Sequence, residues 1–398
     1  MQQAKNSLLN RVRVVSFALA VSSFTWAPRL PELKDHLDLS VAQLGQVFMV
    51  VGLVGLLTSK LNSWLLLNFG SRKMIFVAAP TGVVGNILVA TSNNLAQFLI
   101  GLALCSLAIF IINTASITQG NNYKATFGVD PQANMSAVAN IGALVAMLVG
   151  AAFLTVIPPV AYIIGLSTVA SVGLVLGALQ LSRVDSHMIE SSSPSSSSKM
   201  PWFGKGTGIF WIMVLAVFAS TTAEFSVSDW GAILARDSFG IAAPYYLLPF
   251  VVFQAGVVSA RFATNKLGAK HGISRFVRWS TCSAAVVWAI SLIVGAIVGH
   301  SSPSITLAVT LVGFAAGGWG VGPIWPVFIS AISDGPFNIA IALPRFFSLV
   351  SLAFVLGPGV LGQLANLLTL PYALVVTAGM LFFAGTQART KVLGVNEG

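Results

Sequence analysis

The chain has 398 residues, of which 56% are hydrophobic and only 8% are charged, and its formal net charge is +10. Soluble domains carry about 25% charged residues, so this composition excludes a water-soluble globular protein. The two cysteines exclude a disulfide-stabilised scaffold, and the excess of cations requires a location or partner that accounts for it.

Twelve apolar stretches follow one another along the chain, each near the ~20 residues that an apolar helix needs to cross the hydrocarbon. They are continuously apolar, whereas membrane barrel strands alternate over about 10 residues, so we predict helices. The expected fold class is an all-α membrane protein with 12 transmembrane helices, at residues 13–32, 43–67, 74–92, 95–117, 138–157, 160–181, 208–231, 244–264, 276–298, 305–330, 339–362 and 370–387.

The basic residues are distributed unevenly between the connections. If the amino terminus is cytoplasmic, eighteen of the 21 Lys/Arg fall in inner loops or at the inner ends of spans, and only Arg29, Lys34 and Arg236 fall outside. The positive-inside rule then predicts a multi-pass protein with both termini cytoplasmic. Basic loops beside anionic lipid head groups account for the net charge, so the charge does not indicate a nucleic-acid partner.

The longest hydrophilic stretch lies between the sixth and seventh spans. Residues 191–198 are serines with a single proline, a composition that cannot form a packed core. We interpret residues 182–207 as a flexible cytoplasmic linker. It would join an N-terminal six-helix bundle, residues 1–181, to a C-terminal six-helix bundle, residues 208–398.

A short repeat supports this division. Residues 63–73 (SWLLLNFGSRK) and 261–271 (RFATNKLGAKH) align without a gap at an offset of half the chain. In both copies a span ends at a glycine, Gly70 or Gly268, that is followed by two positions with basic character. Glycine permits a tight reversal between helices, and the cations favour the cytoplasmic head-group layer.

With this repeat the chain resembles the major facilitator superfamily (MFS), whose two six-helix halves carry a Gly-x-x-x-Asp-Arg-x-Gly-Arg-Lys signature in these loops. Within the superfamily it is most similar to the fucose-permease-like subgroup that includes rhizopine permeases. This similarity is carried by Trp26, Arg29 and Pro31 in the first span, by Glu224, Asp229 and Trp230 in the seventh, by GGWGVGPIWP at 317–326, and by GPGVLGQLAN at 357–366.

Both copies depart from the signature. The aspartate is replaced by Leu67 and Asn265, the leading glycine by Ser63 and Arg261, and the first arginine by Asn68 and Lys266. In the family the aspartate helps to latch the cytoplasmic gate through charge interactions. In this chain the latch is therefore expected to be weaker or to be built differently.

The resemblance implies two bundles related by a pseudo-twofold axis, with a central cavity lined by spans 1, 4, 7 and 10 and transport by alternating access. It implies a monomeric secondary transporter in a bacterial-type inner membrane, with no cofactor and no metal, that moves a small organic solute with protons as the coupling ion. Glycines at 142–150, 173–177 and 313–322 are expected to pack helices closely. Bending of span 10 remains the alternative for Gly317, Gly318, Gly320 and Gly322 with Pro323 and Pro326.

Glu224 is the candidate proton-coupling residue. Ionisable groups within a membrane are costly, so each is a functional hypothesis. On a cavity helix, the carboxyl of Glu224 could carry a proton and contact substrate. The alternative is a carboxyl that is bonded to the hydroxyls of Ser220, Thr221 or Thr222 and fixes a helix pair.

Four further residues are candidate substrate ligands. The half-chain offset maps Trp26 onto Glu224, so the two are expected to face one another across the cavity, and an indole suits a sugar ring. Membership of the interfacial aromatic belt is the alternative for Trp26. Asn113 in span 4 and Gln254 in span 8 supply uncharged donors and acceptors, and Trp319 lies in the glycine-rich run of span 10.

Candidate gating residues lie toward both ends of the spans. On the outer side, Asp229 could pair with Arg29 or Arg236; the alternatives are a solvated surface carboxylate and an Arg29 that reaches the outer head groups. On the inner side the candidates are basic: Arg72 and Lys73 of the signature, Arg261 and Arg345. For the last two, snorkelling to the cytoplasmic surface is the default interpretation.

No enzyme site can be assembled from the sequence. His36, His187, His271 and His300 are scattered over loops, and no phosphate-binding Gly-Lys-Ser/Thr loop is present. The favoured function is uptake of a sugar-like or polyol-like solute. Export of amphipathic drug-like compounds is the alternative, and a non-transporting membrane sensor or scaffold is a lower one.

Overall fold

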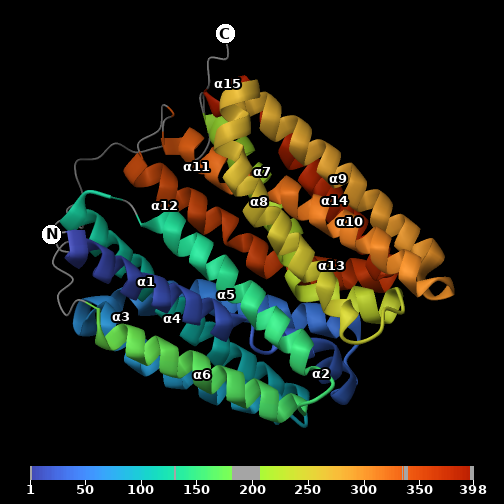
Figure 1. Cartoon of the computed structure of the whole chain (residues 1–398), viewed down its shortest axis with the longest axis horizontal. Coiled ribbons are helices and arrows are strands. Elements are labelled where there is room, and N and C mark those ends of the chain that lie inside the picture. The colour runs from blue at the N-terminus through green and yellow to red at the C-terminus, as the bar shows by residue number, and fades with distance from the viewer. Residues whose placement is uncertain (1, 130, 182–206, 334, 336–338, 395–398) are drawn as a thin grey trace. The chain divides into compact units, whose positions relative to one another are not determined.

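The computed structural model describes residues 2–129, 131–181, 207–333, 335 and 339–394, and within these ranges every regular element is a helix (Figure 1). Twelve helical stretches of the described chain are long and apolar enough to cross a membrane. They overlap the twelve predicted spans one for one, which confirms the predicted all-α membrane fold. The predicted linker, residues 182–207, lies almost entirely outside the described residues.

The chain divides into two compact units. The first comprises Met1–Leu39 and Val50–Ser197, and the second comprises Ser40–Met49 and Ser198–Gly398. The sequence-based division at the linker differs from this at residues 40–49, which begin a helix of the first six spans but pack within the second unit.

The first unit is built around the helix of the first span. In Figure 1 its elements run from blue to green, and its helix α1 packs against α4, α5 and α6. Small residues allow close packing here: a Cβ on Gly142 of α5 would lie 2.6 Å from the carbonyl oxygen of Phe17. The elements are α1 (Gln2–Ser23), η1 (Ala27–Arg29), α2 (Leu30–His36), α3 (Val41–Ala90), α4 (Leu95–Phe127), α5 (Gln132–Phe153) and α6 (Pro159–Leu179).

Helix α3 contains two spans that are separated by a sharp turn at Gly70. The backbone of Gly70 has φ 75° and ψ 157°, values that side-chain-bearing residues rarely adopt. The turn that was predicted for this glycine of the first signature copy is therefore confirmed. It lies between the second and third predicted spans, which end at residue 67 and begin at residue 74.

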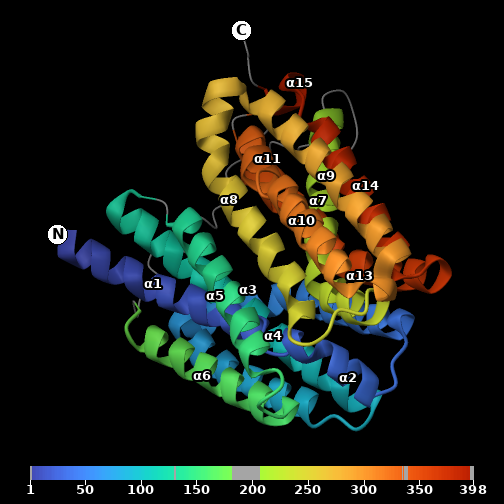
Figure 2. The same ribbon diagram turned by 45° about the vertical axis from the view of Figure 1, so that its right-hand side comes forward.

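In the second unit, α10 lies between α8 and α9, and α14 packs against α7 and α9 (Figure 2). Its elements are α7 (Thr207–Ile233), η2 (Leu234–Ser238), η3 (Tyr245–Leu247), α8 (Leu248–His271), α9 (Ile273–Val298), η4 (Gly299–Ser301), α10 (Pro303–Val321), α11 (Ile324–Ser333), α12 (Ile339–Val350), α13 (Leu352–Leu368), α14 (Leu370–Gln387) and α15 (Thr390–Leu393). Helices α10 and α11 together form span 10, and α12 and α13 form span 11.

The glycines of α10 allow α8 and α9 to pack closely against it. A Cβ on Gly318 would lie 1.9 Å from the carbonyl oxygen of Phe253 in α8, and a Cβ on Gly320 would lie 2.8 Å from that of Ala284 in α9. Gly322 then ends the helix, and Pro323 separates α10 from α11. Both functions considered for this run, close packing and interruption of the helix, are therefore present.

The second signature copy differs from its prediction. Helix α8 continues through Gly268 to His271, and the chain reverses at Gly272, where φ is 82°. Gly268 serves instead to accommodate Ile273, because a Cβ there would lie 2.5 Å from the Ile273 side chain. The prediction that Gly268 makes the turn is wrong. The helix continues through Gly268 because its backbone hydrogen bonds are kept, and Gly272, four residues later, makes the turn instead.

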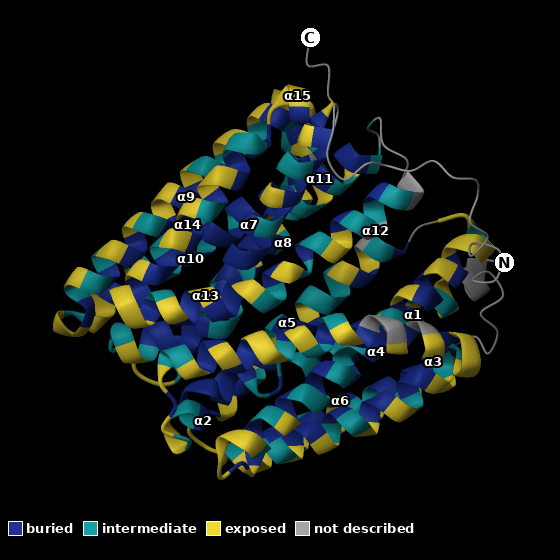
Figure 3. Ribbon diagram, turned by 180° about the vertical axis from the view of Figure 1, so that it is seen from behind, coloured by how far each residue is buried: buried dark blue, intermediate teal, exposed yellow. Residues whose placement is uncertain are grey.

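Large apolar side chains are exposed along the spans, as the stripes on α6 and α9 in Figure 3 illustrate. Val77 and Ile297 expose 70% and 72% of their surfaces. In water such exposure would be unfavourable, whereas in a bilayer these side chains contact acyl chains. The burial pattern therefore agrees with a bundle that is solvated by lipid.

Candidate functional site

Helix α7 carries two carboxyl groups, Glu224 and Asp229, and both are partly exposed. Two of the three hydroxyls considered for Glu224 are engaged elsewhere: Thr222 donates to the carbonyl of Phe218 at 3.0 Å, and Thr221 accepts a bond from Trp325. The third, Ser220 Oγ, is buried and has no hydrogen-bond partner among the described residues. Among the described residues Glu224 makes no hydrogen bond, so the alternative of a carboxyl fixed by neighbouring hydroxyls is not what the structure shows.

Arg261 on α8 donates a hydrogen bond of 3.4 Å from its Nε to the carbonyl oxygen of Gly322, at the break between α10 and α11. Arg261 is partly buried. The interpretation that its head group snorkels to the cytoplasmic surface stays a prediction, and the structure adds one partner inside the second unit, the Gly322 carbonyl.

Trp325 was not identified as a site residue from the sequence. Its Nε1 donates a 3.1 Å hydrogen bond to Thr221 Oγ1, one helical turn from Glu224. Its ring stacks on Phe347 with centroids 6.0 Å apart and 23° between planes, and Phe346 meets it edge-on. The sequence signal was weak, because a tryptophan between isoleucine and proline gives no indication of its partners.

The other candidates of the second unit lie on α8 and α10. Gln254 is 5% exposed, and its Oε1 is buried with no hydrogen-bond partner among the described residues. An unpaired buried acceptor is costly, so this oxygen has unused hydrogen-bonding capacity. Trp319 is partly exposed, and its backbone nitrogen lies 2.9 Å from where a Cβ on Gly256 would be, which shows how closely α8 and α10 pack.

In the first unit, Asn113 on α4 is exposed and makes no hydrogen bond within the described residues. Its neighbour Thr114 is occupied, since Asn62 Nδ2 donates to the Thr114 hydroxyl at 2.9 Å. An amide that faced hydrocarbon would be unfavourable, so Asn113 is better placed to face water or solute. Trp26 precedes η1 and is partly exposed.

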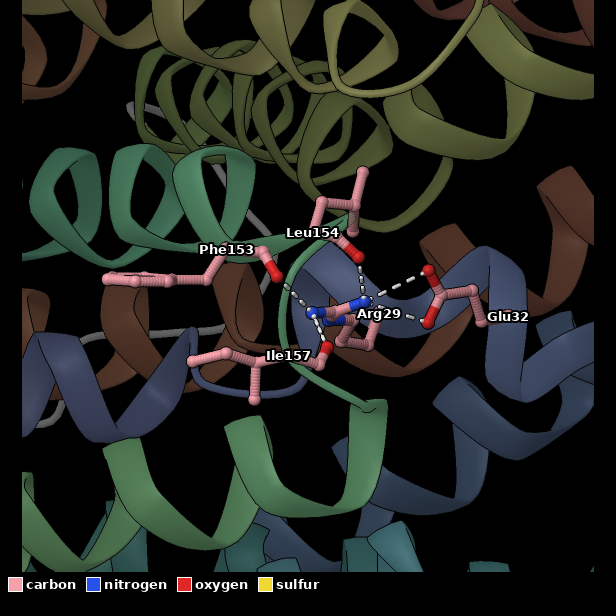
Figure 4. Close-up of polar contacts among 5 residues, drawn as sticks. All are labelled: Arg29, Glu32, Phe153, Leu154 and Ile157. Carbon is pink, nitrogen blue, oxygen red and sulfur yellow. Dashed lines mark hydrogen bonds and ion pairs between the residues drawn. The ribbon is translucent and has the colours of Figure 1, made fainter.

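Arg29 is buried, with 1% of its surface exposed, and its partners all belong to the first unit (Figure 4). Nη1 lies 3.1 Å from both carboxylate oxygens of Glu32 and donates to the carbonyl of Leu154 at 2.7 Å. Nη2 donates to the carbonyls of Phe153 and Ile157 at 2.8 and 2.7 Å. These carbonyls end α5, where a cation also complements the helix dipole.

The surroundings of Arg29 are adapted to it. The guanidinium lies over the ring of Tyr162 at 5.0 Å, and a Cβ on Gly150 would lie 2.3 Å from Pro28, so the glycine lets η1 approach α5. The interpretation of Arg29 as a residue that reaches the outer head groups is wrong, because its side chain points into the protein. Its guanidinium joins the end of span 1 to the end of span 5.

The remaining gating candidates have varied environments. The guanidinium of Arg72 lies over the Phe76 ring at 5.7 Å, Lys73 is exposed, and Arg345 on α12 is partly exposed. Arg236 Nε lies 2.6 Å from Asp237, whereas Asp229 has no hydrogen-bond or ion-pair partner among the described residues.

Next to Arg72, the sequence missed a buried hydrogen bond from Gln119 Nε2 to Ser71 Oγ at 2.7 Å. This uncharged bond joins α4 to the turn at Gly70. It lies in the same loop where the family signature has a charged aspartate.

Twelve apolar helices of the described chain, each long enough to cross a membrane, define a polytopic membrane protein. The family model of the Major Facilitator Superfamily matches residues 12–343. The chain therefore belongs to this superfamily, whose members are transporters and not enzymes.

Individual relatives agree with this assignment. The chain is 23% identical over 388 residues to an uncharacterized MFS-type transporter of Yersinia pestis, a match that covers 95% of this chain and 94% of the relative. The crystal structure of the nucleoside transporter NupG superposes with a TM-score of 0.72 at 13% identity, over 96% of this chain and 98% of that chain. A bacterial homolog of the human lysosomal transporter Spinster, in an inward-facing and unoccupied conformation, gives a TM-score of 0.68 at 12% identity, over 96% of each chain.

At these identities the two structures establish the fold, and the family match establishes the general function. The protein is a multi-pass membrane protein of a secondary transporter family, and it acts on a small-molecule substrate.

Proposed function

We propose that this protein is a proton-coupled secondary transporter that takes up a sugar-like or polyol-like solute across a bacterial-type inner membrane. Both termini are cytoplasmic in this proposal, since eighteen of the 21 Lys/Arg then lie on the inner side. The protein acts as a monomer by alternating access.

The observation that carries the proposal is the state of Glu224. It is a partly exposed carboxyl within a span, and among the described residues it has no hydrogen-bond or ion-pair partner. An unpaired charge in the low-dielectric interior of a membrane is costly to maintain. A proton that binds Glu224 removes this charge, so proton uptake and release can bias two conformations of the protein.

The other proposed ligands suit a neutral, hydroxylated ring. Asn113 and Gln254 offer amide donors and acceptors that bond to no other described residue, and Trp26, Trp319 and Trp325 offer flat apolar faces. The similarity to fucose-permease-like sequences favours sugars and polyols. Nucleosides, which the NupG structure is named for, also carry a hydroxylated ring and belong in the test panel.

A second candidate function is export of amphipathic, drug-like compounds. It is favoured by the number of aromatic contacts in the second unit, where Phe225 and Phe354 meet edge-on with centroids 4.5 Å apart and Trp325 stacks on Phe347. Thermal unfolding of the purified protein against sugars, polyols, nucleosides and cationic drugs separates the two, because a ligand stabilises the state that binds it. A sensor or scaffold without transport would show no flux of any stabilising compound.

Vesicles that contain the purified protein test the proton coupling. With a stabilising solute and an imposed pH gradient, the wild type should accumulate solute, whereas Glu224→Gln should lose accumulation and keep counterflow exchange, because exchange moves no net proton. Asp237→Asn is the matched control, since this carboxyl forms a local pair with Arg236 and should leave accumulation intact. Undiminished accumulation by Glu224→Gln would show that protons are not carried by this residue.

A further inference from the structure

The end of the second unit at which α8 joins α9 carries a cluster of cations without acidic partners. The exposed cations at this end are Lys266, Lys270, His271, Arg275 and Arg278. Among the described residues, none of these five side chains forms a hydrogen bond or an ion pair. Acidic side chains are scarce in this half of the sequence, because Asp334 is the only one between Asp237 and Glu397. The positive charge at this end is therefore not neutralised by the described chain.

A hydrogen bond brings a further arginine to the same end. Ser274, at the start of α9, donates a 2.8 Å hydrogen bond to the carbonyl oxygen of Ala388, which follows α14. Arg389 is the next residue; it is exposed, and its terminal nitrogens bond to no described residue. Arg275, Arg278 and Arg389, which we call the arginine cluster, thus come from the same end of two neighbouring helices.

The arginine cluster lies at one end of an apolar face that is exposed along the spans. Trp279, one residue after Arg278, exposes 70% of its surface. The exposed face of α9 continues at helical spacing with Val286, Ile290 and Ile297. Helix α14 lies beside α9 (Figure 2), and it adds the exposed Phe382, whose carbonyl accepts a 3.7 Å bond from Cys282 Sγ. Cations, an aromatic ring and an apolar surface follow one another in the order of the head group, interface and acyl chains of a lipid.

The chemistry of the cluster suits phosphate groups. The planar guanidinium of arginine can donate two parallel hydrogen bonds to phosphate oxygens. Arg275 and Arg278 are three residues apart on one helix, so they project from the same face. A lipid with a single phosphate would bring one negative charge to three guanidiniums. A lipid with two phosphates brings a second charge and more acyl chains, which suits the neighbouring exposed faces of α9 and α14 better.

We propose that the arginine cluster binds an anionic phospholipid with two phosphates, of the cardiolipin type, whose acyl chains lie along α9 and α14. The guanidiniums of Arg275, Arg278 and Arg389 hold the phosphates, and Trp279 packs at the level of the glycerol groups. The bound lipid links the start of α9 to the end of α14 and stabilises the second unit. This site goes beyond the proposed transport function, and its occupancy does not depend on proton coupling or on the orientation of the protein.

Native mass spectrometry tests the site, because it counts the lipid molecules on each protein. Wild-type protein stripped of lipid in detergent should bind one cardiolipin molecule in preference to phosphatidylglycerol, and phosphatidylethanolamine should not compete. At about fivefold for each cation, Arg275→Gln/Arg278→Gln should weaken cardiolipin binding ~25-fold and Arg389→Gln ~5-fold. Cardiolipin should raise the melting temperature of the wild type but not that of the double variant, because a ligand stabilises the state that binds it.

Controls separate a defined site from general attraction to a basic surface. Lys73→Gln/Lys124→Gln removes the same charge from exposed lysines of the first unit and should bind cardiolipin as the wild type does. In detergent without lipid, Arg275→Gln/Arg278→Gln should melt at the wild-type temperature, since neither side chain bonds to a described residue. Inorganic pyrophosphate supplies two phosphates without acyl chains and should not displace cardiolipin.

Weaker cardiolipin binding in the arginine variants together with unchanged binding in the lysine variant supports the inference. An equal loss in the lysine variant would indicate diffuse attraction and overturn it, as would undiminished binding in the arginine double variant. Phosphatidylglycerol that binds as tightly as cardiolipin would contradict the need for two phosphates, and displacement by pyrophosphate would indicate a site for a free anion. None of these results depends on Glu224, so failure of this inference is distinguishable from failure of the proposed proton coupling.

Discussion

Removing the guanidinium of Arg29 should destabilise the first unit strongly. Arg29→Ala would leave the carbonyls of Phe153, Leu154 and Ile157 and the carboxylate of Glu32 without their shared donor. A hydrogen bond to a charged group contributes about 1.5–3 kcal/mol, and these bonds are not additive because one side chain makes them all. Breaking a buried ionic network costs about 3–5 kcal/mol, and that is the loss of unfolding free energy expected here.

Two milder variants grade the effect. Arg29→Lys keeps the charge but lacks the planar fork that reaches several carbonyls, so we expect a loss of about 2 kcal/mol. Glu32→Gln should cost no more than about 1 kcal/mol, because this carboxylate is 31% exposed and its partner keeps three carbonyls. Arg275→Ala, at an exposed position, should change stability by less than about 0.5 kcal/mol.

The chain contains its own reporter for this measurement. Cys105 is a buried thiol of the first unit, so in a Cys282→Ser background a thiol-reactive fluorophore reports unfolding of that unit. Melting in detergent should rank the variants as wild type, Glu32→Gln, Arg29→Lys and Arg29→Ala in order of decreasing stability. An Arg29→Ala protein as stable as the wild type but unable to transport would refute the reasoning and would assign Arg29 to a gate.

Four further predictions concern other parts of the molecule. Gly318→Ala should prevent stable folding, because its Cβ would overlap the Phe253 carbonyl. Gly379→Ala in α14 has no atom within 4 Å of the added carbon, so it should be neutral or should stabilise the protein by up to about 1 kcal/mol. The yield of folded protein in size-exclusion chromatography and the melting temperature check both variants. Gln119→Leu should lower the melting temperature through a loss of about 1–3 kcal/mol, since it leaves the buried Ser71 hydroxyl without its donor. Thr221→Val should free the Trp325 indole, which would appear as a shift in tryptophan fluorescence and weaker solute binding with little loss of stability. The predicted cytoplasmic location of the carboxyl terminus can be tested with two fusions in a bacterial host. Green fluorescent protein fused to this terminus should fluoresce, and a phosphatase that is active only in the periplasm should be inactive when fused to it. An active phosphatase with no fluorescence would place the terminus outside the cytoplasm.

Features that follow from local composition were predictable. The twelve spans appear in the sequence because a helix in hydrocarbon needs an unbroken apolar run, and the break in span 10 appears because proline and glycine act on their own backbone. The turn at Gly70 could be predicted for the same reason. The sequence could not predict whether Gly268 or Gly272 makes the second turn, since both residues permit a turn and packing against Ile273 decides which one makes it.

The partners of long polar side chains were not predictable. The backbone carbonyls that Arg29 binds lie more than 120 residues away along the chain, and hydropathy gives no sign of them. Arg261 was expected to reach the surface because snorkelling is usual for a basic residue near a span end, and the sequence did not predict its hydrogen bond to the Gly322 carbonyl. Such sites depend on which helices are neighbours, and that information is absent from any single span.

Solute-driven proton movement tests the central claim most directly. Vesicles loaded with a pH-sensitive dye, with the membrane potential clamped, would receive a stabilising solute on one side without any imposed pH gradient. The account predicts that solute entry acidifies the lumen in wild-type vesicles, and that Glu224→Gln vesicles show no pH change. Solute flux through the wild-type protein with no accompanying proton movement would contradict it.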